Sequence, residues 1–265
     1  VIGALCATAA RVHGPEFVRG RLIRPMLDGR PPFVLSDAFP GDLLPVPTAS
    51  RLADRPEAIP RKSLKRGRWL PEGDFVAVRA GQPLDPDHVR ADSDVFQEES
   101  RRHNTLARDS DASLEEGGLF ARSETLFAAT EGGPRYLSLY FRAADDDAVD
   151  VLLDLFHELS LSGFGADVGT GRGQFEIHGE PRPSPELDAA PRAANSVIVL
   201  STFQPGPRDP ADGYWEAFAK FGKLGPQFGL SDRQTHKHTL IVFRPGACFR
   251  CDPQRQFLGR ALTMD

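Results

Sequence analysis

The sequence predicts an α+β protein built from two similar units, each with a strand, a helix and a second strand in that order. Between Tyr136 and Ile177, a strand-like segment precedes an amphipathic helix, a Gly-rich loop and a short apolar segment. Between Asn195 and Cys251, an apolar strand, a helix from Pro210 to Phe221 and a further strand follow one another. This is the order of a ferredoxin-like β-α-β unit, so we expect two such units side by side.

The N-terminal region is predicted to be mostly helical. Val1 to Val12 reads as an apolar helix that Gly14-Pro15 ends, and Glu16 to Leu27 as a second, shorter helix. Phe33 to Leu35 is a short strand candidate. The first helix has no capping residue, whereas a ferredoxin-like unit begins with a strand. We therefore expect one further strand before Val1, and the family resemblance described below implies another beyond Asp265.

The segment Ser36 to Pro47 is rich in proline and apolar residues, and only Asp37 and Asp42 are charged. One interpretation is a packed surface loop. The other, which concerns Ala38 to Pro47, is a docking segment for a neighbouring subunit, because exposed apolar loops often mark interfaces. The sequence does not separate the two.

The helix of the first unit is the clearest element in the sequence. Asp145, Asp146 and Asp147 suit its N-terminus, where a carboxylate caps backbone N–H groups and complements the helix dipole. Apolar residues then recur at helical spacing. They are Val149, Leu152, Leu153, Phe156 and Leu159.

The Gly-rich loop after this helix, Leu161 to Ile177, is the most unusual stretch of the chain. Its glycines are Gly163, Gly165, Gly169, Gly171 and Gly173, and they surround Arg172. A dinucleotide or P-loop motif follows a strand and opens a helix, whereas this loop follows a helix and precedes a predicted strand, Gln174 to Ile177. The alternative is a long turn without a ligand, although ordinary turns take about 2 to 6 residues and one glycine.

A single dense basic run precedes the middle of the chain. It contains Arg61, Lys62, Lys65, Arg66 and Arg68. Trp69 follows directly, and cations beside an aromatic ring are suited to phosphate contact and base stacking. The alternative is a solvated charge run, but the run is unique in an acidic chain and favours RNA.

Composition limits the classes of function. The chain has 265 residues, 40% of them hydrophobic, with a net charge of −5. An acidic chain that binds RNA must cluster its basic residues, since nucleic-acid binders usually present a basic surface. Three cysteines and the lack of a signal peptide predict a reducing, cytoplasmic environment. No apolar run reaches the roughly 18 residues needed to span a membrane.

Neither a metal site nor a catalytic site is predicted. Cys248 and Cys251 form a C-x-x-C pair with His236 and His238 nearby, which could suit zinc. However, two cysteines three apart on a strand point to opposite faces, so structural cysteines are the favoured interpretation. None of the histidines stands in a recognisable catalytic pairing, and we expect no metal and no cofactor.

Several stretches in this order resemble the RAMP superfamily of CRISPR RNA-binding proteins, and within it the fourth-subunit family of the type III-A (Csm) effector complex. They are the Gly-rich loop, Pro32 to Pro40 with Leu44 to Pro47, His103-Asn104-Thr105 with Arg108, and Glu116 to Phe120. The resemblance implies two ferredoxin-like, RRM-like domains, at residues 1–178 and 195–265, joined by a linker at 179–194. It also implies a thumb-like hairpin inserted at about 82–110, and we expect a strand from Leu119 to Ala129 with Phe120 and Phe127 facing inward.

The resemblance further implies a non-catalytic subunit that grips the 5′ handle of CRISPR RNA in antiviral defence. It would join the large polymerase-like (Palm-domain) subunit to the Csm backbone subunit. The alternatives are a RAMP-family endoribonuclease that processes CRISPR RNA, and a purely structural subunit. The candidate RNA-binding residues are Arg61, Lys62, Lys65, Arg66, Arg68, His103, Asn104, Arg108, Gly163, Gly165, Gly169, Gly171, Arg172 and Gly173.

Overall fold

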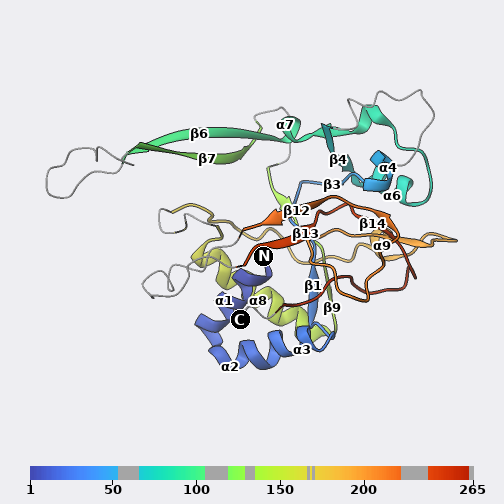
Figure 1. Ribbon diagram of the computed structural model, residues 1–265. Helices are drawn as coiled ribbons and strands as arrows, with labels where there is room; N and C mark the ends of the chain where they lie inside the picture. The colour runs from blue at the N-terminus through green and yellow to red at the C-terminus, as the bar shows by residue number, and fades with distance from the viewer. Residues whose placement is uncertain are drawn as a thin grey trace, which may run out of the picture.

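The chain has an α+β fold with several small antiparallel sheets (Figure 1). The computed structural model describes residues 1–52, 66–104, 119–128, 135–165, 168, 171–221 and 238–262. The helices are α1 (Ile2–His13), α2 (Pro15–Phe17), η1 (Val18–Ile23), α3 (Arg24–Leu27), α4 (Thr48–Leu52), α6 (Glu72–Arg79), η2 (Pro86–His88), α7 (Asp92–Val95), α8 (Asp146–Ser162) and α9 (Pro185–Asp188). The strands are β1 (Phe33–Leu35), β2 (Phe39–Pro40), β3 (Leu43–Pro45), β4 (Gly67–Pro71), β5 (Arg90–Ala91), β6 (Phe96–Asn104), β7 (Leu119–Phe127), β8 (Leu137–Ser138), β9 (Phe141–Ala143), β10 (Ser196–Ile198), β11 (Gly213–Tyr214), β12 (Ala217–Lys220), β13 (Leu240–Phe243) and β14 (Cys248–Arg250).

A helical layer lies at one end of the molecule, where α1, α2, η1 and α3 follow one another and α8 packs on α1 (Figure 1). Gly14, at φ 86°, ends α1, and Pro15 opens α2, where its missing N–H costs nothing. The core of this layer contains Leu5, Leu22 and Leu155, each at most 1% exposed. The predicted N-terminal helices are confirmed.

Helix α8 begins and ends as the sequence predicts. The Asp145 carboxylate accepts a hydrogen bond from the backbone N–H of Ala148 at 2.8 Å. At the other end, Gly163 adopts φ 83° and its N–H donates to the Leu159 carbonyl. Only glycine adopts this conformation at little cost, so the first glycine of the Gly-rich loop is the helix stop. The buried face runs through Leu152, Leu155 and Leu159.

The middle of the body is built around a second core. Antiparallel pairs β1–β9 and β2–β8 form an interrupted ribbon, and β3, β4 and β5 form a three-stranded sheet. Phe39, Leu44, Leu70 and Phe75 are each at most 2% exposed in this core. The Pro-rich segment Ala38 to Pro47 is therefore buried in this protein's own core, apart from the exposed Ala38 and Asp42. It is not the exposed apolar loop that its interpretation as a docking segment requires, so that interpretation is wrong.

The C-terminal region is a set of short strands rather than the predicted strand–helix–strand. Strand β14 pairs with β10 on one side and β11 on the other, and β12 pairs with β13. The helix predicted from Pro210 to Phe221 is wrong, because β11 and β12 occupy that range. Trp215 stacks on Phe243 of β13 at 4.5 Å between ring centroids, so contact with a neighbouring strand overrides the local spacing.

Two further expectations meet the structure only in part. Residues Gln174 to Ile177, predicted as a strand, are irregular, so a complete ferredoxin-like unit is not shown in either half. The predicted linker, 179–194, contains α9 and packs on α6. There Arg79 donates hydrogen bonds to the carbonyls of Glu186 at 2.8 Å and Ala189 at 2.7 Å. The division into two domains stays a prediction.

Candidate nucleic-acid interface

A two-stranded arm, formed by β6 and β7, projects from the body (Figure 1). The two strands pair without a register shift from Phe96 opposite Phe127 to Asn104 opposite Leu119. Strand β6 lies inside the range of about 82–110 predicted for the thumb-like hairpin, whereas its partner β7 lies beyond that range and matches the strand expected from Leu119. That the arm is the thumb-like insertion stays a prediction. Asn104 is the last residue of β6, and Arg108 lies outside the described residues.

The base of the arm is fixed to the body by aromatic side chains. Phe96 stacks on Phe127 at 5.7 Å between ring centroids, and the edge of Trp69 contacts Phe96 at 6.2 Å. Trp69 in turn contacts Phe39 of the core, and its indole N–H donates to Asp92 at 2.8 Å. Trp69, expected to stack on an RNA base, is instead part of this internal contact.

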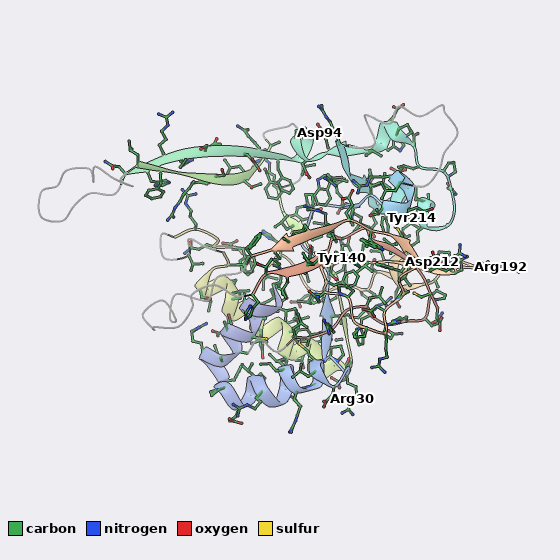
Figure 2. All side chains as sticks on the ribbon, in the orientation of Figure 1. Arg30, Asp94, Tyr140, Arg192, Asp212 and Tyr214 are labelled. Atoms are coloured by element: carbon green, nitrogen blue, oxygen red, sulfur yellow. The ribbon has the colours of Figure 1, made fainter. Side chains whose placement is uncertain are left out.

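Asp94 on α7 marks the place where the arm leaves the body (Figure 2). Its carboxylate accepts a hydrogen bond from the Ala91 N–H at 2.8 Å, which caps this one-turn helix. Together with the aromatic contacts, the cap fixes the direction in which β6 begins.

One face of the arm carries a sequence of charges and rings from base to tip. Because side chains alternate along a strand, cross-strand partners at every second position share a face. The pairs on this face are Gln97 with Leu126, Glu99 with Glu124, Arg101 with Arg122, and His103 with Phe120. The face is acidic near the base, cationic further out, and aromatic near the tip.

The outer part of this face is a flat stack of rings. The His103 ring lies on the Phe120 ring, with 5.4 Å between centroids and 16° between planes. The Arg122 guanidinium carbon lies 5.3 Å from the Phe120 centroid. Phe120 is 38% exposed, so the prediction that it faces inward is wrong. Aromatic rings and guanidinium planes of this kind are what single-stranded bases stack on.

The Gly-rich loop is closed by its own backbone. The N–H of Phe164 donates to the Gly173 carbonyl at 2.8 Å, and the N–H of Gly171 donates to Val168 at 3.0 Å. Gly173 adopts φ 71°, and a Cβ there would collide with the backbone carbonyl of Phe164. Gly173 is therefore required by the fold of the loop itself, whereas Gly165 and Gly171 face open space.

The loop lies against the arm, and Arg172 makes the contact. Its Nη1 lies 2.5 Å from Oε2 of Glu124, which is also 3.6 Å from Nε of Arg101. A shallow hollow between loop and strand is lined by Ser123, Glu124, Thr125, Leu126, Phe164, Gly165, Arg172 and Gly173. The structure thus brings the Gly-rich loop and the arm, predicted separately, into one site.

The basic run is only partly described. Arg61, Lys62 and Lys65 lie outside the described residues, as do Arg108 and Gly169 of the other predicted sites. Arg66 is exposed at the start of β4. Strand β4 lies beyond the base of the arm, away from the tip (Figure 1).

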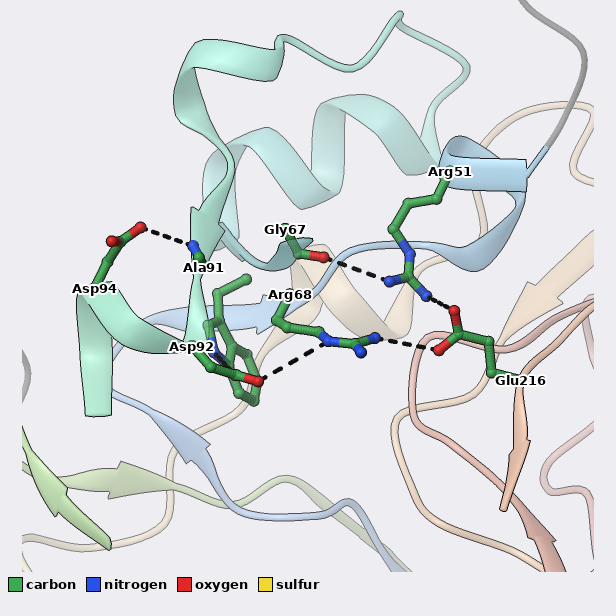
Figure 3. Close-up of polar contacts among 8 residues, drawn as sticks. Arg51, Gly67, Arg68, Ala91, Asp92, Asp94 and Glu216 are labelled. Carbon is green, nitrogen blue, oxygen red and sulfur yellow. Dashed lines mark hydrogen bonds and ion pairs between the residues drawn. The ribbon is translucent and has the colours of Figure 1, made fainter. Parts of the chain in front are cut away.

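Arg68 belongs to an internal charge cluster (Figure 3). Its guanidinium lies 3.2 Å from one carboxylate oxygen of Glu216, and Arg51 Nη2 lies 2.7 Å from the other. Burial opposes ionisation of Glu216, but the hydrogen bond and charge of Arg51, with those of Arg68, together hold its pKa below the usual value. Arg68 therefore stabilises the fold and is a weaker candidate for RNA than Arg66.

Sequence reasoning did not select Arg101, Arg122 and Glu124. Arg101 and Arg122 become one cationic patch only because the strands pair in this register, and residues 105–118 separate the strands in the chain. A two-residue alternation counted outward from Phe96 and Phe127 would have placed them on one face.

In the described part of the chain, no group of three or more His, Cys, Asp or Glu side chains is placed to hold a metal ion. Cys248 is buried in β14 and Cys251 is half-buried, and burial raises the pKa of both thiols. His236 lies outside the described residues.

Among the helices that are described, none is long and apolar enough to cross a membrane.

The fold is similar to that of one chain in the crystal structure of a Csm1-Csm4 cassette in complex with pppApApA. The TM-score is 0.50 and the sequence identity 15%, over 95% of this chain and 80% of that chain. No protein-family model matches the sequence. No curated protein matches it either. The likeness extends over almost the whole chain and concerns the fold.

Proposed function

We propose that this chain is a non-catalytic, RNA-binding subunit of a type III CRISPR effector complex, which holds the 5′ handle of CRISPR RNA. The observation that carries the proposal is the contact between the Gly-rich loop and the projecting arm. It places Arg172 beside a face that bears Arg101, Arg122 and the His103–Phe120 stack. Similarity of fold to a chain of the Csm1-Csm4 cassette supports the same assignment.

The chemistry of this face suits single-stranded RNA. Arginine offers a planar donor fork for phosphate oxygens and a surface on which bases stack. The aromatic stack at the tip is tolerant of sequence, because every base presents a flat face. Glu99 and Glu124 are the acidic residues of this face, so RNA would contact chiefly the arm from Arg101 outward and the Arg172 side of the loop.

Protein partners complete the proposal. The structure that contains the similar chain is a Csm1-Csm4 cassette in complex with an oligonucleotide, pppApApA. By analogy, this chain would join the large polymerase-like (Palm-domain) subunit to a Csm backbone subunit. A net charge of −5 disfavours RNA capture by the isolated chain, because the chain as a whole repels phosphate. We therefore place RNA binding within the assembly.

The proposal assigns no catalysis to this chain. His103, the histidine at the site, stacks on Phe120, and its Nε2 makes no hydrogen bond and is shielded from solvent. A general base must reach the proton that it removes, so a shielded nitrogen is poorly placed for RNA cleavage.

The test is incubation of end-labelled CRISPR repeat RNA with the chain, alone and assembled with its partner subunits. Retention of intact RNA by the assembly is the expected result. Specific cleavage that is lost in His103→Ala would favour a processing endoribonuclease. Absence of RNA contact even in the assembly would favour a purely structural subunit.

A further inference from the structure

One carboxylate oxygen at the candidate interface is approached by two arginines. Oε2 of Glu124 lies 2.5 Å from Arg172 of the Gly-rich loop and 3.6 Å from Arg101 of β6. The Glu124 side chain is 11% exposed, whereas those of Arg172 and Arg101 are 43% and 54% exposed. The anion is therefore enclosed, and both cations remain open to solvent.

The geometry of the contact leaves hydrogen-bonding capacity unused. Arginine pairs most strongly with an anion when two parallel N–H groups meet two oxygens. Here both arginines approach the same oxygen, which accepts no well-directed hydrogen bond despite the short distance to Arg172. Arg101 also donates a long hydrogen bond of 3.4 Å to Oε2 of Glu99. A phosphate group, with several acceptor oxygens and more charge, would satisfy these guanidinium groups better than Glu124 does.

We propose that Arg172 and Arg101 form an anion subsite that Glu124 fills in the RNA-free chain, and that a phosphate of bound RNA takes the place of this carboxylate. The inference rests on the proposed function and adds a regulatory contact to it. Without RNA, Glu124 holds the Gly-rich loop against β7. With RNA, Arg172 exchanges the Glu124 carboxylate for an RNA phosphate. Because Glu124 competes with phosphate for the arginines, it lowers the affinity for RNA and for other anions.

The experiment compares Glu124→Gln with a charge-matched control on the same arm. Glu98→Gln removes an equal charge from the opposite face, where residue 98 pairs with Thr125. The probe is a fluorescein-labelled single-stranded RNA of about 10 nucleotides, long enough for a typical single-strand site. Fluorescence anisotropy is measured at several salt concentrations, with the chain alone and in the assembly.

Glu124→Gln is expected to bind the RNA about two- to fivefold more tightly, the range for loss of a competing, partly exposed ion pair. Glu98→Gln should bind like the unaltered chain. In an Arg172→Gln background, Glu124→Gln should bring no gain, because the subsite has lost its main cation. A double-mutant cycle on the RNA-free chain should show that Glu124 and Arg172 are energetically coupled in urea unfolding.

Three outcomes would overturn the inference, and they differ in what they say of the proposed function. If RNA binds but Glu124→Gln and Glu98→Gln behave alike, Glu124 does not occupy the subsite, and the RNA-binding role stands. If no variant binds RNA even in the assembly, the proposed function fails and the inference fails with it. A cycle without coupling in the RNA-free chain would show that the contact does not hold the loop.

Discussion

The Arg51–Glu216–Arg68 cluster gives a prediction whose size follows from burial. The change is Glu216→Gln, which keeps the shape of the side chain and removes its charge. The Arg51 side chain is 8% exposed and that of Arg68 is 37% exposed. Loss of the carboxylate therefore leaves a buried cation at Arg51 without its counter-ion, whereas Arg68 remains in contact with water.

The expected loss in the free energy of unfolding on Glu216→Gln lies between two limits. Breaking a fully buried ion pair costs about 3–5 kcal/mol, and an exposed pair contributes about 0–1 kcal/mol. Because the Glu216 side chain is 32% exposed, we expect Glu216→Gln to lower the free energy of unfolding by about 1–3 kcal/mol. Arg68→Ala should cost about 0–1 kcal/mol, as a surface pair does.

The pH dependence has a definite sign. The folded-state pKa of Glu216 lies below its ordinary value of 4.5. The ionised carboxylate thus stabilises the fold above the pKa of the unfolded chain, and this contribution is lost as the pH falls through the folded-state pKa. The cost of Glu216→Gln should be constant above about pH 5 and should shrink below about pH 4.5.

The assay is urea unfolding followed by tryptophan fluorescence, with Trp215 next to the substituted residue in the chain. Arg51→Ala and Arg68→Ala are measured beside Glu216→Gln at each pH. The reasoning is refuted if Arg68→Ala costs as much as Arg51→Ala, or if the cost of Glu216→Gln does not change as the pH is lowered.

Three further predictions concern RNA, the loop and the core. Arg66→Ala should lower RNA affinity and reduce the slope of log affinity against log salt by about 0.7, whereas Arg68→Ala should leave the slope unchanged, as measured by anisotropy. Gly173→Ala should lower both the melting temperature and RNA affinity, because a Cβ at φ 71° would collide with the Phe164 carbonyl. Gly171→Ala, at a similar φ of 79° but with open space around the new Cβ, carries the backbone strain alone and is the milder control; equal effects would contradict the assignment. Leu155→Ala, at a side chain that is 0% exposed, should cost about 2–5 kcal/mol in urea unfolding, and a cost below about 1 kcal/mol would contradict the described core.

Local signals in the sequence were sufficient for part of the fold. The carboxylate cap at Asp145 and the glycine at the other end of α8 act within a few residues, so the helix was predictable from its own segment. The strand at Phe33–Leu35 was predictable only as a short apolar run after two prolines, because its partner β9 is distant in the chain.

Long-range contacts decided the elements that the sequence did not predict. The segment around Trp215 has helical spacing, yet Trp215 stacks on Phe243 between two short strands, β11 and β12, of which β12 pairs with β13. Burial of Phe39 and Leu44 turned an apparent surface loop into core. Arg68 was predicted to contact RNA because its local charge is visible in the sequence, whereas its partner Glu216 is distant in the chain.

The candidate site shows the same division. The Gly-rich loop was predicted because its composition is unusual within a short window, and His103 was predicted from the resemblance to the RAMP superfamily. Glu124, Arg101 and Arg122 matter only after β6 and β7 pair and the loop docks on β7, and no local pattern encodes those two events.

The most direct test of the central claim is photo-crosslinking of the assembly to CRISPR RNA that carries 4-thiouridine in its 5′ handle, followed by mass spectrometry of the crosslinked peptides. The account predicts crosslinks to this chain on the Gly-rich loop, residues 163–173, and on the arm near Arg101, His103 and Phe120. Crosslinks confined to the helical layer of α1, α2 and α3, or to other subunits alone, would contradict it.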